Sequence, residues 1–123
     1  MEIFRVKEEE RYAIVEVLAS KMDSLVAPKI KAELVLLSGK GYANIILDLS
    51  HTKYIDSSGL SALLVGDRQC RANNGTFVIS GANDYVLKLI QISQLDRVLT
   101  LIPTLQESIE YIIMDDIARN DGI

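Results

Sequence analysis

The feature that most constrains the fold is the run YANIILDLS at residues 42–50, in which apolar side chains follow one another almost without a break. A strand of this kind is typical of a parallel sheet with both faces covered, whereas a strand with one face in water alternates apolar and polar residues. A second such run, TFVIS, occupies residues 76–80 after an Asn-Gly turn signal. Segments with helical spacing separate these runs, so the sequence predicts an α/β domain with a largely parallel sheet.

Two helices are predicted on either side of the 42–50 run. The first begins close to Pro28, because proline is tolerated only in the first helical turn, and it ends at Gly39 and Gly41. The second covers residues 57–73. The predicted inward stripe of the first helix is Ala27, Ile30, Leu34 and Leu37, and that of the second is Leu60, Leu63, Gly66 and Cys70, with Leu64 beside it.

Three further elements follow from local signals. Residues 2–7 and 11–18 predict an antiparallel hairpin, since two β-rich runs are separated only by a short acidic turn. Asn83 is expected to open a short helix that reaches about Ile92, and residues 97–102, RVLTLI, to form the last strand.

The C-terminal region predicts a fourth helix, because Thr104 and Glu107 have the spacing of a capping box. The polar tail at residues 114–123 is expected to fray. The order β-β-α-β-α-β-α-β-α therefore predicts one domain over residues 1–123, with a mixed central sheet (the N-terminal hairpin plus parallel strands) packed with about four helices.

Charge and cysteine content exclude several partners. A net charge of −4 gives no electrostatic reason to seek nucleic-acid phosphates or anionic lipids. No apolar run approaches the ~20 residues of a membrane helix. A lone cysteine, Cys70, can form no intrachain disulfide and fits a reducing compartment. We expect a cytoplasmic monomer that binds neither nucleic acid nor membrane. Arg68 and Arg71 are interpreted first as a solvated helix face and second as a binding patch for a protein partner.

The usual enzyme motifs are missing. A G-x-S-x-G nucleophile elbow needs glycine two residues on either side of the serine, and neither Ser57 nor Ser58 has both. The only histidine, His51, leaves a small hydrolase based on Ser58 and His51 as a weak hypothesis. SGKGYAN lacks the P-loop pattern, and Cys70 has no cysteine or histidine at metal spacing. We expect no enzyme activity, cofactor or metal.

The stretch Asp56-Ser57-Ser58-Gly59 carries the remaining signal. It lies at the predicted start of a helix, where Asp or Ser accepts hydrogen bonds from the first free N–H groups. It also lies beyond the carboxyl end of an apolar strand, where open α/β sheets place their sites. A phosphate on a serine here would be tolerated by the helix terminus and would change the surface by about −1.5 to −2 charges. This pattern suits a switch that alters binding without altering the fold.

D-S-S-G-L, with an apolar strand before it and an apolar helix after it, resembles the signature of the STAS domain, which is named for sulfate transporters and anti-sigma factor antagonists. The resemblance covers nearly the whole chain, including LDLSHTKYIDSSGL, TFVISG and ISQLDRVLTLIPTLQESIEYI. It implies a mixed sheet with helices packed mainly against it. Chain length and the lack of a membrane segment favour the stand-alone bacterial antagonist over the transporter-fused form.

The resemblance also implies a function and a set of site residues. An unphosphorylated antagonist of this family engages an anti-sigma factor that is also an ATP-dependent serine kinase, and a phosphatase reverses the modification. The phosphorylated serine corresponds to Ser58, and Asp23 matches a position near the binding surface. With these two, the expected partner-binding residues are Asp56, Ser57 and Gly59, the last leaving room for the kinase. This sequence departs from the family pattern before Asp23, where the usual glycine is missing, and at Pro28.

Two further hypotheses remain open. In one, the chain is a constitutive STAS scaffold in a transporter-accessory or stress-signalling complex, and Ser57 and Ser58 only cap the helix. In the other, the chain is the hydrolase based on Ser58 and His51. Phosphopeptide analysis separates the first from a switch, and labelling by a serine-reactive phosphonate would support the second.

Overall fold

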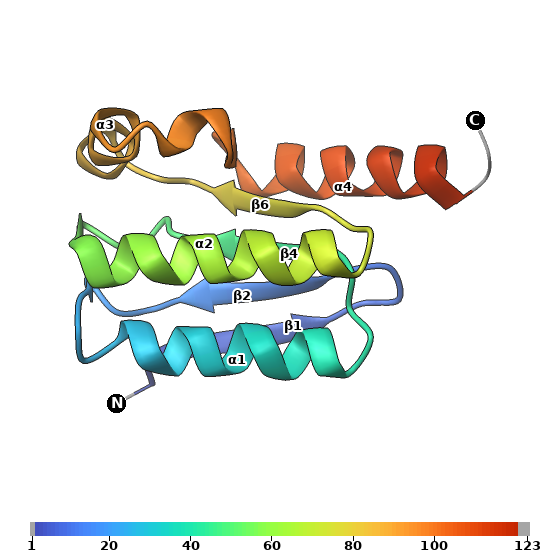
Figure 1. Cartoon of the computed structure of the whole chain (residues 1–123), viewed down its shortest axis with the longest axis horizontal. Helices are drawn as coiled ribbons and strands as arrows, with labels where there is room; N and C mark the ends of the chain where they lie inside the picture. Colours follow the sequence, from blue (N-terminus) through green and yellow to red (C-terminus); the bar gives the residue numbers. More distant parts are fainter. Residues whose placement is uncertain (1, 121–123) are drawn as a thin grey trace.

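The computed structural model describes residues 2–120 of the 123-residue chain. Within these residues, seven strands and four α-helices follow one another, with one 3-10 helix. Figure 1 labels the main elements. In chain order they are β1 (Phe4–Glu8), β2 (Ala13–Val17), β3 (Lys21–Met22), α1 (Ala27–Gly39), β4 (Ile45–Asp48), β5 (Tyr54–Ile55), α2 (Ser57–Ala72), β6 (Phe77–Ser80), α3 (Asp84–Ile92), η1 (Leu95–Arg97), β7 (Thr100–Ile102) and α4 (Leu105–Asn120).

The central sheet has five strands in the order β1-β2-β4-β6-β7. The β1–β2 hairpin is antiparallel and the other three pairings are parallel, which confirms the predicted mixed sheet. All residues of β4 and β6 are buried, as continuous apolar runs require. The carboxyl ends of β2, β4 and β6 therefore meet at one edge, which is on the left in Figure 1.

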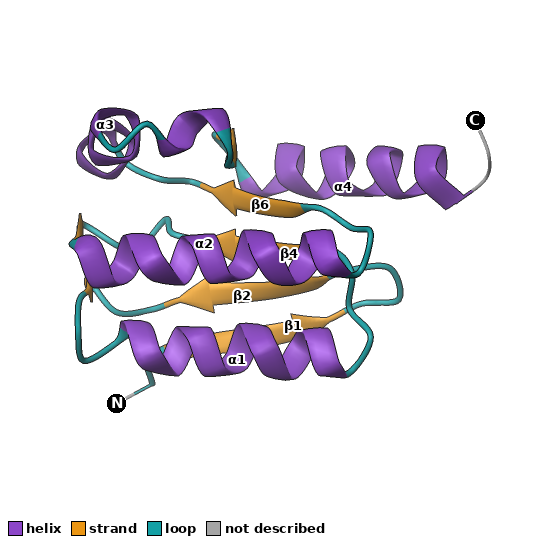
Figure 2. Ribbon diagram, viewed as in Figure 1, coloured by secondary structure: helices purple, strands orange, loops and turns teal. Residues whose placement is uncertain are grey.

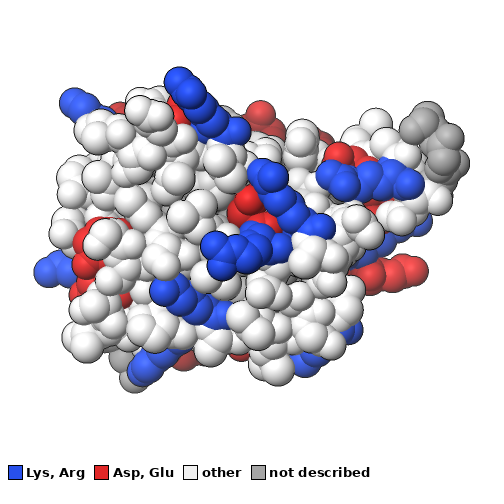
Figure 3. Space-filling view, in the orientation of Figure 1, with Lys and Arg blue, Asp and Glu red and all other residues white. Residues whose placement is uncertain are grey.

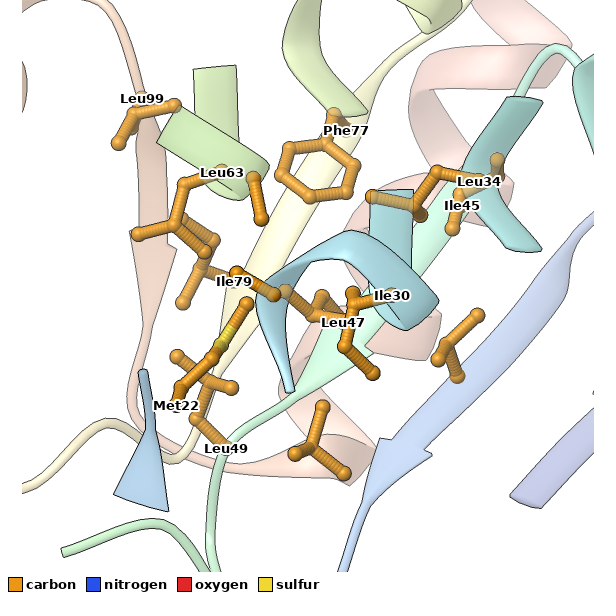
Figure 4. Packing of buried hydrophobic residues seen from close by; sticks show 14 of the residues in the cluster. Met22, Ile30, Leu34, Ile45, Leu47, Leu49, Leu63, Phe77, Ile79 and Leu99 are labelled. Atoms are coloured by element: carbon orange, nitrogen blue, oxygen red, sulfur yellow. The ribbon is translucent and has the colours of Figure 1, made fainter. Parts of the chain in front are cut away.

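Helices cover the two faces of the sheet unequally. One face is covered by α1 and α2, which lie side by side in Figure 2, and α3 contributes Val86 and Ile90 to the same core. Figure 4 shows Met22 of β3, which is fully buried, among the side chains of this core. Among residues 2–120, α4 is the helix that covers the other face, and the smaller core there consists of Ile14, Ile46, Val78 and Ile112. The predicted stripe of α1 is entirely buried, and in α2 Leu63, Gly66 and Cys70 are buried while Leu60 is half-buried.

Two predictions at the C-terminal end are wrong. The last strand begins at Thr100 rather than at residue 97, because Gln94 adopts a left-handed φ of 60° and the chain then closes the 3-10 helix η1. Within the tail, residues 114–120 do not fray but continue α4. Asp116 accepts hydrogen bonds there from Arg11 at 3.0 Å and from Asn44 at 3.1 Å, contacts that a local pattern cannot reveal. Residues 121–123 of that tail lie outside the described residues.

Candidate functional site

The start of α2 is placed by a two-stranded sheet that the sequence did not predict. Strands β3 and β5 pair in parallel, with Lys21 opposite Tyr54 and Met22 opposite Ile55. Asp23 and Asp56 are the next residues along these paired strands, so the turn before α1 and the start of α2 lie next to each other. The structure thus brings the predicted Asp23 to the Asp56-Ser57-Ser58-Gly59 segment, at the carboxyl edge of the sheet.

Asp56 is the residue that caps α2. Its backbone is extended, and its Oδ1 accepts hydrogen bonds from the N–H of Ser58 at 2.9 Å and of Gly59 at 3.2 Å. Two of the free donors of the helix terminus are thereby satisfied. In the part of the chain that the structure describes, no hydrogen bond engages the hydroxyl of Ser57 or Ser58. Ser57 is exposed and Ser58 is half-buried.

Asp23 performs a similar task before α1. Its Oδ1 accepts from the N–H of Leu25 at 3.0 Å and of Val26 at 3.2 Å, and its backbone carbonyl accepts from Ala27. This turn directs the chain into the helix, and Pro28 follows in the first turn as predicted. Asp56 therefore caps α2, whereas Asp23 stabilises the turn that leads into α1, whose N-cap residue Val26 has no side-chain cap.

Gly59 is needed for packing. A Cβ at this position would lie 2.5 Å from the carbonyl oxygen of Met22 and would also collide with the side chain of Ile55. The space that this glycine leaves is thus filled by β3 and β5 and is not open to a kinase. The motif glycine lets α2 approach the small sheet closely, which corrects the expectation that it makes room for a partner.

Exposed apolar side chains surround the segment and were missed by the sequence reasoning. The rings of Tyr54 and Tyr85 stack with their centroids 5.7 Å apart, and the two residues remain 40% and 51% exposed. Leu25, in the turn after Asp23, is 78% exposed. Asn83 holds α3 against the segment, because its Nδ2 donates to the carbonyl of Lys53 at 3.2 Å while its Oδ1 caps α3. The tyrosines belong to different elements, so no spacing rule could have paired them.

The other reactive side chains have structural partners. His51 Nε2 lies 2.9 Å from Glu16 Oε2, at the end of β2. Cys70 is fully buried, and burial raises the pKa of its thiol to about 12, so the nucleophilic thiolate is suppressed at neutral pH. Among residues 2–120, no three His, Cys, Asp or Glu side chains are grouped so that they could hold a metal ion.

A comparison of the sequence with protein-family models identifies the family of this chain. The STAS domain model matches residues 4–108. The chain belongs to the STAS domain family. This STAS domain is 26% identical over 96 residues to the anti-sigma-B factor antagonist of Listeria monocytogenes, an alignment that covers 78% of this chain and 84% of the relative.

Solved structures share the fold of this STAS domain. The phosphorylated form of the Bacillus cell fate determinant SpoIIAA superposes with a TM-score of 0.70 at 21% identity, covering 89% of this chain and 98% of that chain. A sulfate transporter family protein from Wolinella succinogenes superposes with a TM-score of 0.74 at 18% identity, covering 84% and 85%. The fold prediction is therefore confirmed, and the same fold is found in SpoIIAA and in a sulfate transporter family protein.

The basic pair on α2 lies at the far end of that helix from Ser58. Arg71 pairs with Asp67 at 2.9 Å and reaches the carbonyl of Val98, while Arg68 is exposed. Figure 3 shows the face of the molecule that α1 and α2 cover. Basic side chains gather over the middle of that face, with acidic atoms among them. The STAS domain has no helix within residues 2–120 that is long and apolar enough to cross a membrane.

Proposed function

We propose that this STAS domain is an anti-sigma factor antagonist whose binding is switched by phosphorylation of Ser58. The observation that carries the proposal is that the helix cap and the candidate phosphorylation site at the start of α2 are different residues. Asp56 caps the helix through Oδ1, so the cap does not need the Ser58 hydroxyl. Among the described residues this hydroxyl makes no hydrogen bond, and Ser58 is half-buried at the helix start. The serine is thus available for modification while the helix start is held by its neighbour.

A phosphate on Ser58 would change the surface strongly and the fold little. The group would carry about −1.5 to −2 charges and would stand beside the carboxylates of Asp56 and Asp23. The N–H groups of Ser58 and Gly59 already bond to Asp56, so a phosphate would add negative charge rather than restore a missing cap. A partner docked over this surface would meet a dianion, and like-charge repulsion and desolvation would weaken the complex.

The partners follow from the same proposal. The unphosphorylated form engages an anti-sigma factor that also acts as a serine kinase, the phosphorylated form is released, and a serine phosphatase restores binding. The names of the curated relatives support this proposal, as does the match of D-S-S-G-L to the family signature. The binding residues would be Asp23, Asp56, Ser57 and Ser58, with Gly59 acting through the packing of α2. The protein would work in the cytoplasm as a monomer, without enzyme activity.

A constitutive scaffold is the second proposal. It is supported by the likeness to a sulfate transporter family protein, since a STAS fold is used there too. In that case Asp56 would cap α2, Ser57 and Ser58 would remain unmodified, and binding would not depend on phosphate.

Intact-mass and phosphopeptide analysis of the protein from its native cells separates the two proposals. A phosphate on Ser58 that disappears in a Ser58→Ala variant and persists in Ser57→Ala supports the switch. Unmodified protein under all growth conditions, together with partner capture that Ser58→Ala leaves unchanged, would replace the switch by the scaffold.

A further inference from the structure

A hollow of about 360 Å³ lies on the α4 face of the sheet, on the opposite face from α2. Its apolar surface comes from Val6 of β1, from Tyr12 just before β2, from Ile14 of β2, and from Leu105 and Ile109 of α4. The hollow exists because α4 alone covers this face and leaves the hairpin side of the sheet partly open. A volume of this size falls at the small end of ligand sites, which span roughly 300–1,000 Å³.

Asp48 lies at one end of the hollow and is 6% exposed. Its Oδ1 accepts from the N–H of Ser50 at 2.9 Å. Among the described residues, no donor bonds to its Oδ2. Its register partner Ser80 is fully buried, and the Ser80 hydroxyl also has no hydrogen-bond partner in residues 2–120. A carboxylate with little exposure favours a paired donor, and Asp48 Oδ2 is an acceptor that no described donor uses.

The cations at the rim do not complete it. Arg5 Nε pairs with Glu2 at 3.1 Å, and Lys7 Nζ lies 3.6 Å from Glu9. Both basic side chains are mostly exposed, at 63% and 73%. Their charged ends are thus engaged with exterior carboxylates.

Glu16 adds a second carboxylate at the Asp48 end. It is the register partner of Asp48 on β2, on the same face of the sheet, and it also lines the hollow. Its Oε2 faces His51 at 2.9 Å. The hollow thus holds two neighbouring carboxylates, an apolar wall, and the basic side chains of Arg5 and Lys7, which pair with Glu2 and Glu9. The carboxylates and the apolar wall together match a cation with an apolar body.

We propose that this hollow binds a small organic amine. Its ammonium group donates to Asp48 Oδ2 and to the Glu16 carboxylate, in charge-assisted hydrogen bonds. Its apolar body lies against Ile14, Leu105 and Ile109. The site is separate from Ser58, so the proposal does not rest on the phosphorylation switch.

Titration of the full chain with n-hexylamine at neutral pH, followed by amide NMR, tests the proposal. We expect saturable shifts of the Ile14, Leu105 and Ile109 amides. Hexan-1-ol and hexanoate have the same body without the cation, and we expect each to bind at least about tenfold more weakly, since a hydrogen bond to a charged group is worth more than that factor. Asp48→Asn keeps the shape of the side chain and should remove this preference.

Controls separate this site from other sources of binding. Glu10→Gln alters an exposed carboxylate that does not line the hollow and should leave hexylamine affinity unchanged. Ile109→Phe fills the hollow and should abolish binding even if Asp48→Asn fails to fold. Equal affinity for hexan-1-ol and hexylamine would overturn the proposal. So would shifts confined to the acidic turn at residues 8–10, an absence of saturable binding, or full binding by Ile109→Phe.

Discussion

The carbonyl oxygen of Met22 lies 2.5 Å from the point where a Cβ on Gly59 would stand. This oxygen belongs to the backbone of β3, which pairs with β5, so it cannot move aside without disturbing the small sheet. We expect Gly59→Ala to lower the free energy of unfolding by about 1–3 kcal/mol, the range for overpacking a filled interior. Urea denaturation followed by circular dichroism measures the change.

Gly39→Ala provides the matched control for that prediction. Gly39 ends α1, and a Cβ there would meet nothing within 4 Å. Alanine has the higher helix propensity, so this variant should be as stable as the parent or slightly more stable. Equal unfolding midpoints for Gly59→Ala and Gly39→Ala would show that the close approach of α2 to β3 is not a constraint.

Removal of the α2 cap should have a moderate cost. Asp56→Ala deletes the oxygen that accepts from the N–H of Ser58 and Gly59, and a lost N-cap costs about 0.5–2 kcal/mol. Asp56→Asn keeps an acceptor and should recover most of the stability. Chemical denaturation of the three proteins would contradict this reading if Asp56→Asn were as unstable as Asp56→Ala.

Burial of Cys70 predicts a loss of stability at alkaline pH. The pKa of its thiol is raised from 9.0 to about 12 in the folded chain, mainly by burial. Between these values the unfolded chain releases the proton and the folded chain keeps it. The stabilising contribution is therefore complete below pH 9 and falls as the pH rises, by up to about 1.4 kcal/mol per pH unit.

The comparison with Cys70→Ala isolates that effect. The variant loses packing at every pH, but its unfolding free energy should fall less steeply than that of the parent between pH 9 and pH 11. Tyrosines and lysines titrate in both proteins and cancel in the difference. Parallel pH profiles would show that the thiol is ionised with similar ease in the folded and unfolded chains.

The order of the main elements was predictable from the sequence because each has a strong local signal. The apolar runs of β4 and β6 require cover on both faces, and the stripe from Ala27 to Leu37 fits one helical face. A cap at the 56–59 segment was predictable for the same reason, although the residues alone did not say which side chain would supply it. Asp56 supplies it because its backbone is extended and Ser57 is already helical.

Features that rest on distant contacts were not predictable from local patterns. Strands β3 and β5 have two residues each, too few for a periodic signal, yet their pairing brings Asp23 beside Asp56. The Tyr54–Tyr85 stack joins β5 to α3, and likewise depends on the tertiary fold. The sequence predicted a frayed tail from residue 114 because the partners of Asp116, Arg11 and Asn44, lie more than 70 positions away in the chain.

Asn44 should contribute strongly to stability, because its side chain bonds to Asp116 in the C-terminal half of α4. It is 3% exposed, its Nδ2 donates to Asp116 and to the carbonyl of Arg11, and its Oδ1 accepts from Thr76. Asn44→Ala leaves buried groups without partners, and each such group costs about 1–3 kcal/mol. Asp116→Ala should cost less, because Asn44 then keeps its two other bonds.

Hydrogen exchange measures whether that network orders the tail. We expect the amides of residues 114–119 to exchange faster in Asp116→Ala than in the parent, and faster still in Asn44→Ala. Arg68→Ala, at an exposed position on α2, is the control and should leave them unchanged. Rapid exchange of these amides in the parent itself would restore the expectation of a frayed tail.

The switch proposed at Ser58 predicts a separation of binding from stability. Ser58→Asp places a negative charge beside Asp56 and Asp23, and it should weaken capture of the anti-sigma partner at least about tenfold, the equivalent of about 1.4 kcal/mol. The melting temperature should change little, because the half-buried Ser58 side chain makes no hydrogen bond in the described residues and Asp56 supplies the helix cap. Ser57→Asp introduces the same charge one residue earlier, on an exposed side chain, and should weaken binding less. Calorimetry with the captured partner, alongside thermal unfolding of each variant, decides the matter: full binding by Ser58→Asp, or its unfolding, would contradict the switch.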